Sequence, residues 1–296
     1  MHGLYFILEE GSLGEDSLLS QTRRLLRRFH LRARQGLGQH FLVDDEVLSV
    51  ITSAAELGPG DTVIEVGPGL GVLTRELTQK AGRVIAVELD DKLAAALTGA
   101  LASFNNVSVI NKDILDIAPA SLVSGAYKVV ANLPYYITSP VLRHFLEASV
   151  KPEMMIVMVQ KEVAEVIAAA PGRCSVLSIS VQFYGSPEII RYVPASSFYP
   201  APEVDSALLK IDVYPRPAVA VTDEAGFFAL VRAGFAASRK QLVNSLAQGL
   251  QINKPESASL LEKAKIAPQR RAETLTLDEW ALLWQVFQER KERQEC

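Results

Sequence analysis

The feature that most limits the possible folds of this chain is a glycine-rich turn at residues 65–71, with the sequence EVGPGLG. Residues 62–64 before the turn predict a strand, and residues 72–77 after it show a helical pattern. Because glycine has no Cβ, a ligand can closely approach the backbone N–H groups of such a turn. We therefore expect a strand–turn–helix unit that binds a ligand, although this glycine spacing is a weak signal when it stands alone.

A second predicted strand, residues 83–87, ends in Glu88, roughly twenty residues after Gly67. An acid at this position can accept hydrogen bonds from the two hydroxyls of a ribose. Nicotinamide dinucleotides and S-adenosylmethionine both carry such a ribose. The dinucleotide fingerprint expects a third glycine, but Val72 and Leu73 stand in its place. The sequence therefore favours the methyl donor.

A third predicted strand, residues 107–110, leads to Asp113 and Ile114. The Asp113 carboxylate can accept a hydrogen bond from an adenine amino group, while Ile114 packs on the purine ring. Taken singly, Glu88 and Asp113 are equally well explained as ordinary polar residues at strand ends. Taken together at successive strand ends, they favour a cofactor crevice at the carboxyl edge of a parallel sheet.

The tetrad Asn132-Leu133-Pro134-Tyr135 directly follows residues 128–131, which predict a short buried strand. The Asn132 side-chain amide and the Leu133 carbonyl can accept the two protons of an amino group on a planar base, while the Tyr135 ring stacks on that base. With those protons held, the nitrogen lone pair can attack an electrophile. A proline turn with an exposed tyrosine is the alternative. The cofactor motifs upstream favour a catalytic tetrad.

From Phe41 to about Val213, predicted strands alternate with helical patterns, which is typical of a doubly wound sheet. Proline cannot continue a strand ladder, so residues 214–217 (YPRP) indicate a linker, and the chain beyond it is helical, with a capping box at residues 276–279. We expect an α/β fold: a Rossmann-like class I methyltransferase sheet with a smaller C-terminal all-helical domain. The predicted parts are an N-terminal extension at 1–21, an S-adenosylmethionine-dependent methyltransferase domain at 22–213 with a basic segment at 22–40, and the helical domain at 214–296.

The chain carries a net charge of −4, but its basic residues are clustered. Residues 22–35 contain arginines and no acid, residues 238–241 (SRKQ) are expected to begin a helix, and residues 269–271 (QRR) form a third cluster. Each cluster can be a phosphate-binding surface or a solvated helix face. RNA binding is favoured if all three share a face with the tetrad. The predicted RNA-binding residues are Arg23, Arg24, Arg27, Arg28, Arg32, Arg34, Arg239, Lys240, Arg270 and Arg271.

The two cysteines, Cys174 and Cys296, cannot form a disulfide framework, and neither lies near a His/Asp group in the sequence. We therefore expect a reducing, cytoplasmic compartment and no metal site. No stretch reaches the apolar length of a membrane span. Residues 1–21 contain Glu and Asp but no Lys or Arg, which argues against a signal peptide or a mitochondrial presequence.

In their order along the chain, these motifs resemble those of the rRNA adenine N6-dimethyltransferases. The resemblance is closest to the bacterial branch of that family that acts on the small ribosomal subunit. Residues 39–42 (QHFL), 160–163 (QKEV) and 198–206 (FYPAPEVDS) fit the same family. The resemblance runs from about Arg34 to about Trp284, which is nearly the whole chain.

The resemblance implies that the cofactor is S-adenosylmethionine, that the product is S-adenosylhomocysteine, and that Phe198 stacks on the second face of the target base. His40 departs from the family, which usually has Asn at this position. Its imidazole can still donate or accept one hydrogen bond, or it can simply fill space beside Phe41. The predicted cofactor-binding residues are Gln39, His40, Leu42, Gly67, Gly69, Glu88, Leu89, Asp113, Ile114 and Asn132.

The function implied is methylation of N6 on two adjacent adenosines near the 3′ end of small-subunit (16S) rRNA, giving N6,N6-dimethyladenosine during ribosome biogenesis. We expect a monomer that acts on the immature small subunit and binds no membrane. The target base must leave its stack to reach the pocket. Three alternatives remain open: a large-subunit rRNA methyltransferase, a DNA adenine methyltransferase, and a ribosome-assembly factor that acts mainly by binding.

Overall fold

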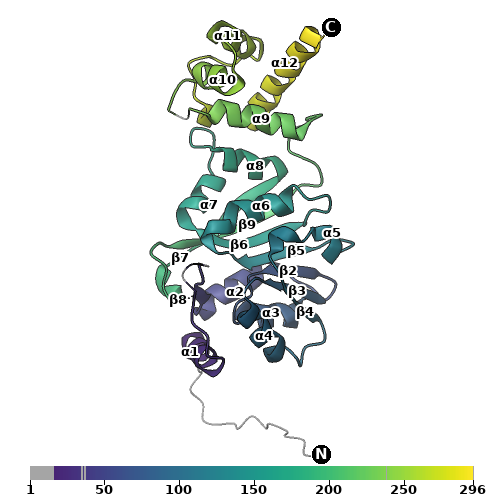
Figure 1. Cartoon of the computed structure of the whole chain (residues 1–296), viewed down its shortest axis with the longest axis vertical. Helices are drawn as coiled ribbons and strands as arrows, with labels where there is room; N and C mark the ends of the chain where they lie inside the picture. Colours follow the sequence, from purple (N-terminus) through teal and green to yellow (C-terminus); the bar gives the residue numbers. More distant parts are fainter. Residues whose placement is uncertain (1–16, 35, 37, 238, 296) are drawn as a thin grey trace, which may run out of the picture.

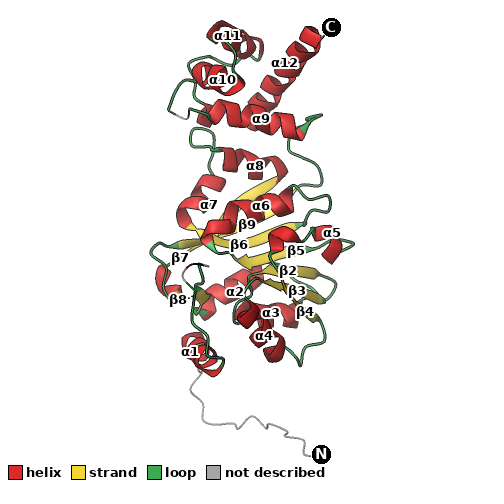
Figure 2. Ribbon diagram, viewed as in Figure 1, coloured by secondary structure: helices red, strands yellow, loops and turns green. Residues whose placement is uncertain are grey.

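A computed structural model describes residues 17–34, 36, 38–237 and 239–295, with side chains through residue 290. The predictions for residues 1–16, Gln35, Ser238 and Cys296 therefore lie outside the described residues. The centre of the structure is a seven-stranded sheet of order β4-β3-β2-β5-β6-β9-β7 (Figures 1 and 2). Its strands are β2 (Thr62–Val66), β3 (Arg83–Glu88), β4 (Val107–Asn111), β5 (Lys128–Asn132), β6 (Met154–Gln160), β7 (Gly185–Val193) and β9 (Ser206–Val213).

The strands β2 to β6 run parallel, and β9 runs antiparallel to both of its neighbours, β6 and β7. Strands that run in the same direction cannot be joined by a tight turn, so helices connect the strands that follow one another along the chain. These helices are α3 (Val72–Lys80), α4 (Asp91–Ala100), α5 (Pro119–Leu122), α6 (Thr138–Leu146), α7 (Lys161–Ile167) and α8 (Val176–Tyr184), preceded by α2 (Asp45–Ala54). The prediction of a mostly parallel, doubly wound sheet is confirmed.

Apolar cores cover the two faces of the sheet because successive strand residues point to opposite sides. Val63 packs in a cluster with Val47 of α2 and Leu77 of α3. Its neighbour Ile64 belongs to a different cluster, which includes Phe145 of α6. Helices therefore bury both faces of the sheet, and the strand ends are the places left for a ligand.

A second, two-stranded sheet joins segments that are far apart in the sequence. Strand β1 (Phe41–Leu42) pairs antiparallel with β8 (Phe198–Tyr199), with Phe41 opposite Tyr199 and Leu42 opposite Phe198. Short 3-10 turns stand next to this sheet and the main one: η2 (Ile114–Asp116), η3 (Tyr135–Ile137) and η4 (Ala195–Ser197). The pairing brings two of the family motifs, QHFL and FYPAPEVDS, side by side.

The basic N-terminal segment forms helix α1 (Leu18–Arg28). The side chain of Ser17 caps this helix by accepting from Ser20 N, and Leu18 and Leu26 are buried. The helix therefore begins inside the stretch predicted as an unassigned extension, because its inner face packs on the protein. Its arginines occupy the outer face, where Arg23, Arg24, Arg27 and Arg28 are exposed.

The chain beyond β9 is helical, as predicted, with α9 (Glu224–Phe235), α10 (Leu242–Leu250), α11 (Lys254–Lys263), η5 (Ala272–Thr274) and α12 (Leu277–Glu295). The predicted capping box is confirmed: Glu279 N donates to Thr276 Oγ1 (3.2 Å), and Thr276 N donates to Glu279 Oε2 (2.9 Å). Helix α10 begins at Leu242, so Arg239 and Lys240 lie in the preceding turn and not within the helix.

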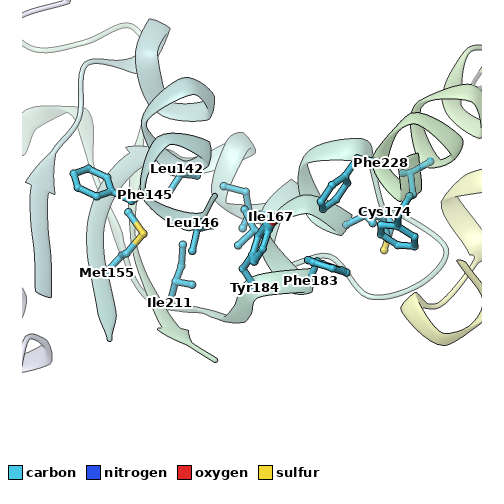
Figure 3. Close-up of a cluster of buried hydrophobic side chains, with 14 of the residues drawn as sticks. Leu142, Phe145, Leu146, Met155, Ile167, Cys174, Phe183, Tyr184, Ile211 and Phe228 are labelled. Carbon is cyan, nitrogen blue, oxygen red and sulfur yellow. The ribbon is translucent and has the colours of Figure 1, made fainter. Parts of the chain in front are cut away.

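These helices share an apolar core with the sheet domain. Phe183 of α8 stacks on Phe227 of α9 (5.2 Å between ring centroids) and meets Phe228 edge-on (5.1 Å). Figure 3 shows how the cluster runs from Met155 of β6 to Phe228 of α9. Among the described residues, no helix is both long enough and apolar enough to cross a membrane.

Candidate cofactor and methyl-transfer site

A pocket opens at the carboxyl ends of the parallel strands, where the strand order reverses between β2 and β5. Its walls are the segments that follow β2, β3, β4 and β5, together with residues 38–42 of the N-terminal segment. All predicted cofactor residues line this pocket, as do the four residues of the tetrad. Sequence motifs that are up to about a hundred residues apart meet here because parallel strands end at the same edge.

The turn after β2 depends on glycine. Gly67 and Gly69 have φ values of +67° and +59°, in the left-handed region that residues with a Cβ rarely adopt. A Cβ on Gly69 would also lie 3.1 Å from the Phe41 ring. The backbone N–H groups of the turn are bound within the chain: Gly67 N donates to Val87 O (2.9 Å), Gly71 N to Pro68 O (2.9 Å) and Gly69 N to Glu88 Oε2 (3.0 Å).

Glu88 is the last residue of β3 and is only 6% exposed. Burial raises the pKa of its carboxyl group, while hydrogen bonds from Asp90 N and Gly69 N oppose that shift. A carboxylate has about four lone-pair positions, so Glu88 can still accept hydrogen bonds from a ligand while it holds these two donors. Its geometry therefore fits the predicted contact with two ribose hydroxyls.

The next wall of the pocket follows β4. Asp113 caps η2 by accepting from Leu115 N at Oδ1 (2.9 Å). Ile114 is buried and lines the pocket beside it. Leu89, at 45% exposure, stands at the adjacent strand end. An acceptor next to apolar side chains is the arrangement that the sequence predicted for an adenine ring.

Glu65 is a pocket residue that the sequence predictions missed. It is 1% exposed, lines the pocket, and has no hydrogen-bond partner at Oε2 among the described residues. Burial raises the pKa of this carboxyl group to about 8, and the nearby Glu88 carboxylate adds to the shift. The available signal was an acid near the end of the strand, two residues before Gly67.

The tetrad begins at Asn132, the last residue of β5. Its Nδ2 donates to the backbone oxygen of His40 (2.9 Å), and Leu133 N donates to Met158 O (3.1 Å) on β6. The hydroxyl of Tyr135 is hydrogen-bonded to Ser206 Oγ (2.8 Å). The tetrad is therefore held from the N-terminal segment, from β6 and from β9.

Phe198 does not fit the stacking role predicted for it. It is only 4% exposed, packs in the core cluster that contains Leu42, and is not among the residues that line the pocket. The pairing of β8 with β1 turns this side chain inward, whereas the next residue, Tyr199, is half-buried and carries the guanidinium of Arg23 over its ring (5.1 Å to the centroid).

The three basic clusters do not gather around the pocket. Helix α1 and helices α9–α12 lie at opposite ends of the long axis of the molecule (Figure 1). Arg34 is paired with the buried Asp90 (3.0 Å), and its backbone N donates to Gln39 Oε1 (2.9 Å). These contacts tie the segment before β1 to the rim of the pocket.

Arg270 is committed to partners within the chain. Its guanidinium pairs with both carboxylate oxygens of Glu279 and donates to Thr274 O (2.5 Å). Because its guanidinium N–H groups donate to these partners, Arg270 stabilises the start of α12 and is not available to a phosphate. Arg239, Lys240 and Arg271 are exposed. Among the described residues, no group of three or more His, Cys, Asp or Glu is placed to hold a metal ion.

A glycine turn after the first strand of the main sheet, an acid at the end of the next strand, and one reversed strand among parallel ones define a class I methyltransferase. The comparison with known families is more specific. Residues 30–289 match the model of the family described as "Ribosomal RNA adenine dimethylase". The chain belongs to this family.

Two relatives illustrate the similarity. A Dehalococcoides mccartyi protein named "Ribosomal RNA small subunit methyltransferase A" is 53% identical over 278 residues, which is 93% of this chain and 96% of that protein. A protein of the same name from Alkaliphilus metalliredigens is 42% identical over 272 residues, covering 89% and 95% of the two chains.

Solved structures agree on the fold. The 23S rRNA methyltransferase ErmE is similar over 84% of this chain and 99% of its own, with a TM-score of 0.67 and 27% identity. A dimethyladenosine transferase from Plasmodium falciparum has a TM-score of 0.74 over 85% of this chain and 98% of its own. At 24% identity, the second likeness shows the fold alone.

Proposed function

We propose that this protein transfers methyl groups from S-adenosylmethionine to N6 of two adjacent adenosines near the 3′ end of 16S rRNA in the immature small ribosomal subunit. The observation that carries the proposal is that the tetrad from Asn132 to Tyr135 shares one pocket with the glycine turn and Glu88. The relatives named as small-subunit methyltransferases support this choice of rRNA. We propose that the protein acts as a monomer.

The pocket residues fit the cofactor. The buried Oε2 of Glu65, which has no hydrogen-bond partner among the described residues, and the carboxyl group of Glu88 give the pocket acceptors for a ligand that carries a cationic group and hydroxyls. Glu88 would hold the ribose hydroxyls, Asp113 and Ile114 the adenine, and the turn at Gly67 would approach the ligand with its backbone. When bound, S-adenosylmethionine supplies an electrophilic methyl group on a sulfonium.

The tetrad handles the target base. Asn132 Oδ1 and the Leu133 carbonyl accept the two protons of the exocyclic amine, so that its lone pair points toward the methyl donor. The Tyr135 ring holds the flipped base by stacking. The product amine is cationic and releases its proton without a strong general base. Catalysis here consists of positioning and electrostatics.

The proposed RNA-contacting residues are fewer than those predicted from the sequence. The exposed arginines of α1 supply phosphate contacts near the pocket, since Arg23 stands over Tyr199 next to the QHFL segment. Arg239, Lys240 and Arg271 provide a second, distant contact at the other end of the molecule. We do not retain Arg270 and Phe198, because one is ion-paired and the other is buried.

The test is to incubate the purified protein with labelled methyl donor and under-methylated small subunits, and to map the modified adenosines. Two adjacent N6,N6-dimethyladenosines near the 3′ end of 16S rRNA are expected. Parallel reactions with large subunits and with duplex DNA serve as controls. Label in either control, or tight binding of the small subunit without methylation, would contradict the proposal.

A further inference from the structure

His40 has three contacts that the cofactor role leaves unexplained. Its backbone oxygen accepts from Asn132 Nδ2 (2.9 Å). Its imidazole stacks on the ring of Tyr135, with centroids 5.9 Å apart and 23° between the planes. Its Nδ1 lies 2.7 Å from the carbonyl oxygen of Pro200. One residue therefore touches both functional members of the tetrad and the segment after β8.

We propose that His40 is a positioning residue, which sets the Asn132 amide and the Tyr135 ring before the target adenine enters. This inference rests on the proposed function of the tetrad. It goes beyond the predicted contact between His40 and the cofactor, because it assigns His40 an effect on the methyl-transfer step itself.

The backbone of His40 sets the direction of the Asn132 amide. A side-chain amide has a donor end and an acceptor end, and a backbone carbonyl can only accept. The carbonyl of His40 therefore holds Nδ2, and Oδ1 is the end left to accept a proton from the target amine. Turning the amide over would bring two acceptors together and cost a partly buried hydrogen bond.

The side chain of His40 is itself fixed by two contacts. Because the Pro200 carbonyl can only accept, the proton of this hydrogen bond is on Nδ1, and the side chain is anchored to the segment after β8. That anchor holds the His40 backbone in register with Asn132. The same ring lies against Tyr135, whose hydroxyl is held at Ser206. Tyr135 is thus fixed at its ring face and at its hydroxyl.

Two substitutions separate the two contacts of the side chain. His40→Asn places an amide nitrogen near the position of Nδ1, so it keeps a donor for Pro200 but loses the ring. His40→Phe keeps a ring beside Tyr135 but loses the donor. His40→Ala loses both contacts. A matched control is His144→Ala, because His144 on α6 also bonds a backbone carbonyl through its ring (Ile117 O, 3.0 Å) but does not line the pocket.

The experiment is single-turnover methylation of small subunits at saturating methyl donor and RNA, with both affinities measured separately. His40→Ala should lower the rate constant roughly ten- to hundredfold, the range expected for a misplaced reacting group. His40→Asn and His40→Phe should each recover part of the loss, and His144→Ala should match the native protein. In an Asn132→Ala background, the further loss from His40→Ala should shrink, since the two residues are coupled.

A native rate for His40→Ala at saturation, with only donor affinity reduced, would make His40 a cofactor ligand alone and overturn the positioning role. A second readout needs no activity: the Asn132 side-chain amide resonance of the free protein should shift in His40→Ala and stay in place in His144→Ala. An unchanged resonance in His40→Ala also overturns the inference. If the native protein fails to methylate, the function proposed above is wrong, and the resonance alone decides the role of His40.

Discussion

At the scale of single residues, the buried acid Glu65 makes the stability of the folded protein depend on pH. Its pKa is about 8 in the folded protein against an ordinary value of 4.5, because burial disfavours the charged form. The folded state therefore binds this proton more tightly than the unfolded state. Stability falls as the pH rises from the unfolded pKa toward the folded one.

We predict that Glu65→Gln removes this fall in stability with rising pH. Between about pH 5 and pH 8, the unfolding free energy of the native protein should decline relative to that of Glu65→Gln, which cannot ionise. Urea unfolding in the absence of donor measures the difference at each pH. Glu262→Gln, at an exposed position on α11, is the control. Parallel curves for the native protein and Glu65→Gln would show that Glu65 is not buried in this way.

Glu88 is the residue on which donor binding should depend most. We predict that Glu88→Ala weakens donor binding by roughly a hundredfold or more, since two hydrogen bonds to a charged group contribute ~1.5–3 kcal/mol each. Glu88 also accepts from Gly69 N and Asp90 N, so part of the loss comes from the turn. Glu88→Gln is the variant of matched size. Calorimetry that finds unchanged affinity for both variants would remove Glu88 from the cofactor site.

Within the tetrad, substitutions should distinguish the residue that acts on the methyl-transfer rate from the residue that holds the base by stacking. Asn132→Ala should reduce the single-turnover rate more than the RNA affinity, because the amide acts on the reacting amine. Tyr135→Ala should weaken capture of the flipped base, since stacking contributes ~1–3 kcal/mol per base. Tyr135→Phe should keep most activity, losing only the bond to Ser206. If Tyr135→Phe is as inactive as Tyr135→Ala, the stacking role is wrong.

The sequence could predict the pocket residues that follow strands, because a parallel sheet collects its strand ends at one edge. Glu88, Asp113 and Asn132 are of this kind. It could not predict the burial of Phe198, since that depends on the pairing of β8 with the distant strand β1. The contacts of His40 were hidden for the same reason, as they join residue 40 to residues 132, 135 and 200. The ion pair of Arg270 with Glu279 spans only nine residues of sequence, but it depends on how the chain turns between the two residues.

At the scale of elements, α1 is a helix whose inner face is buried against the protein and whose outer face is basic. The run of arginines was visible in the sequence, but the start of the helix at Leu18 was not, because it depends on packing of Leu18 against the core. The helix presents Arg27 and Arg28 on its exposed side. This arrangement fits a phosphate-binding surface. Because these arginines are exposed, replacing them should leave the fold intact.

We predict that Arg27→Ala and Arg28→Ala weaken small-subunit RNA binding and leave donor binding unchanged. Each neutralised phosphate contact should lower the slope of log affinity against log salt by roughly 1. Arg290→Ala, which removes an arginine paired with Glu256 at the far end of the chain, is the control. An unchanged salt slope in both α1 variants would mean that this helix face is only solvated.

At the scale of the whole molecule, the linker predicted at residues 214–217 lies between two segments of the chain that share one apolar core. The apolar cluster that includes Met155 of β6 also includes Phe183 before the junction and Phe228 beyond it (Figure 3). The C-terminal helices therefore bury surface that the sheet domain would otherwise expose. Helices that share a core with their neighbour are expected to unfold together with it.

This cooperativity can be measured because both tryptophans, Trp280 and Trp284, lie in α12. Tryptophan fluorescence then reports the C-terminal helices, while far-ultraviolet circular dichroism reports the whole chain. We predict coincident urea transitions by the two probes. Phe183→Ala should destabilise the protein by ~3–5 kcal/mol, the usual cost of a cavity left by a buried aromatic ring, whereas Leu282→Ala at an exposed position should not. Two separate transitions in the native protein would show that residues 214–296 fold on their own and that the shared cluster contributes little to stability.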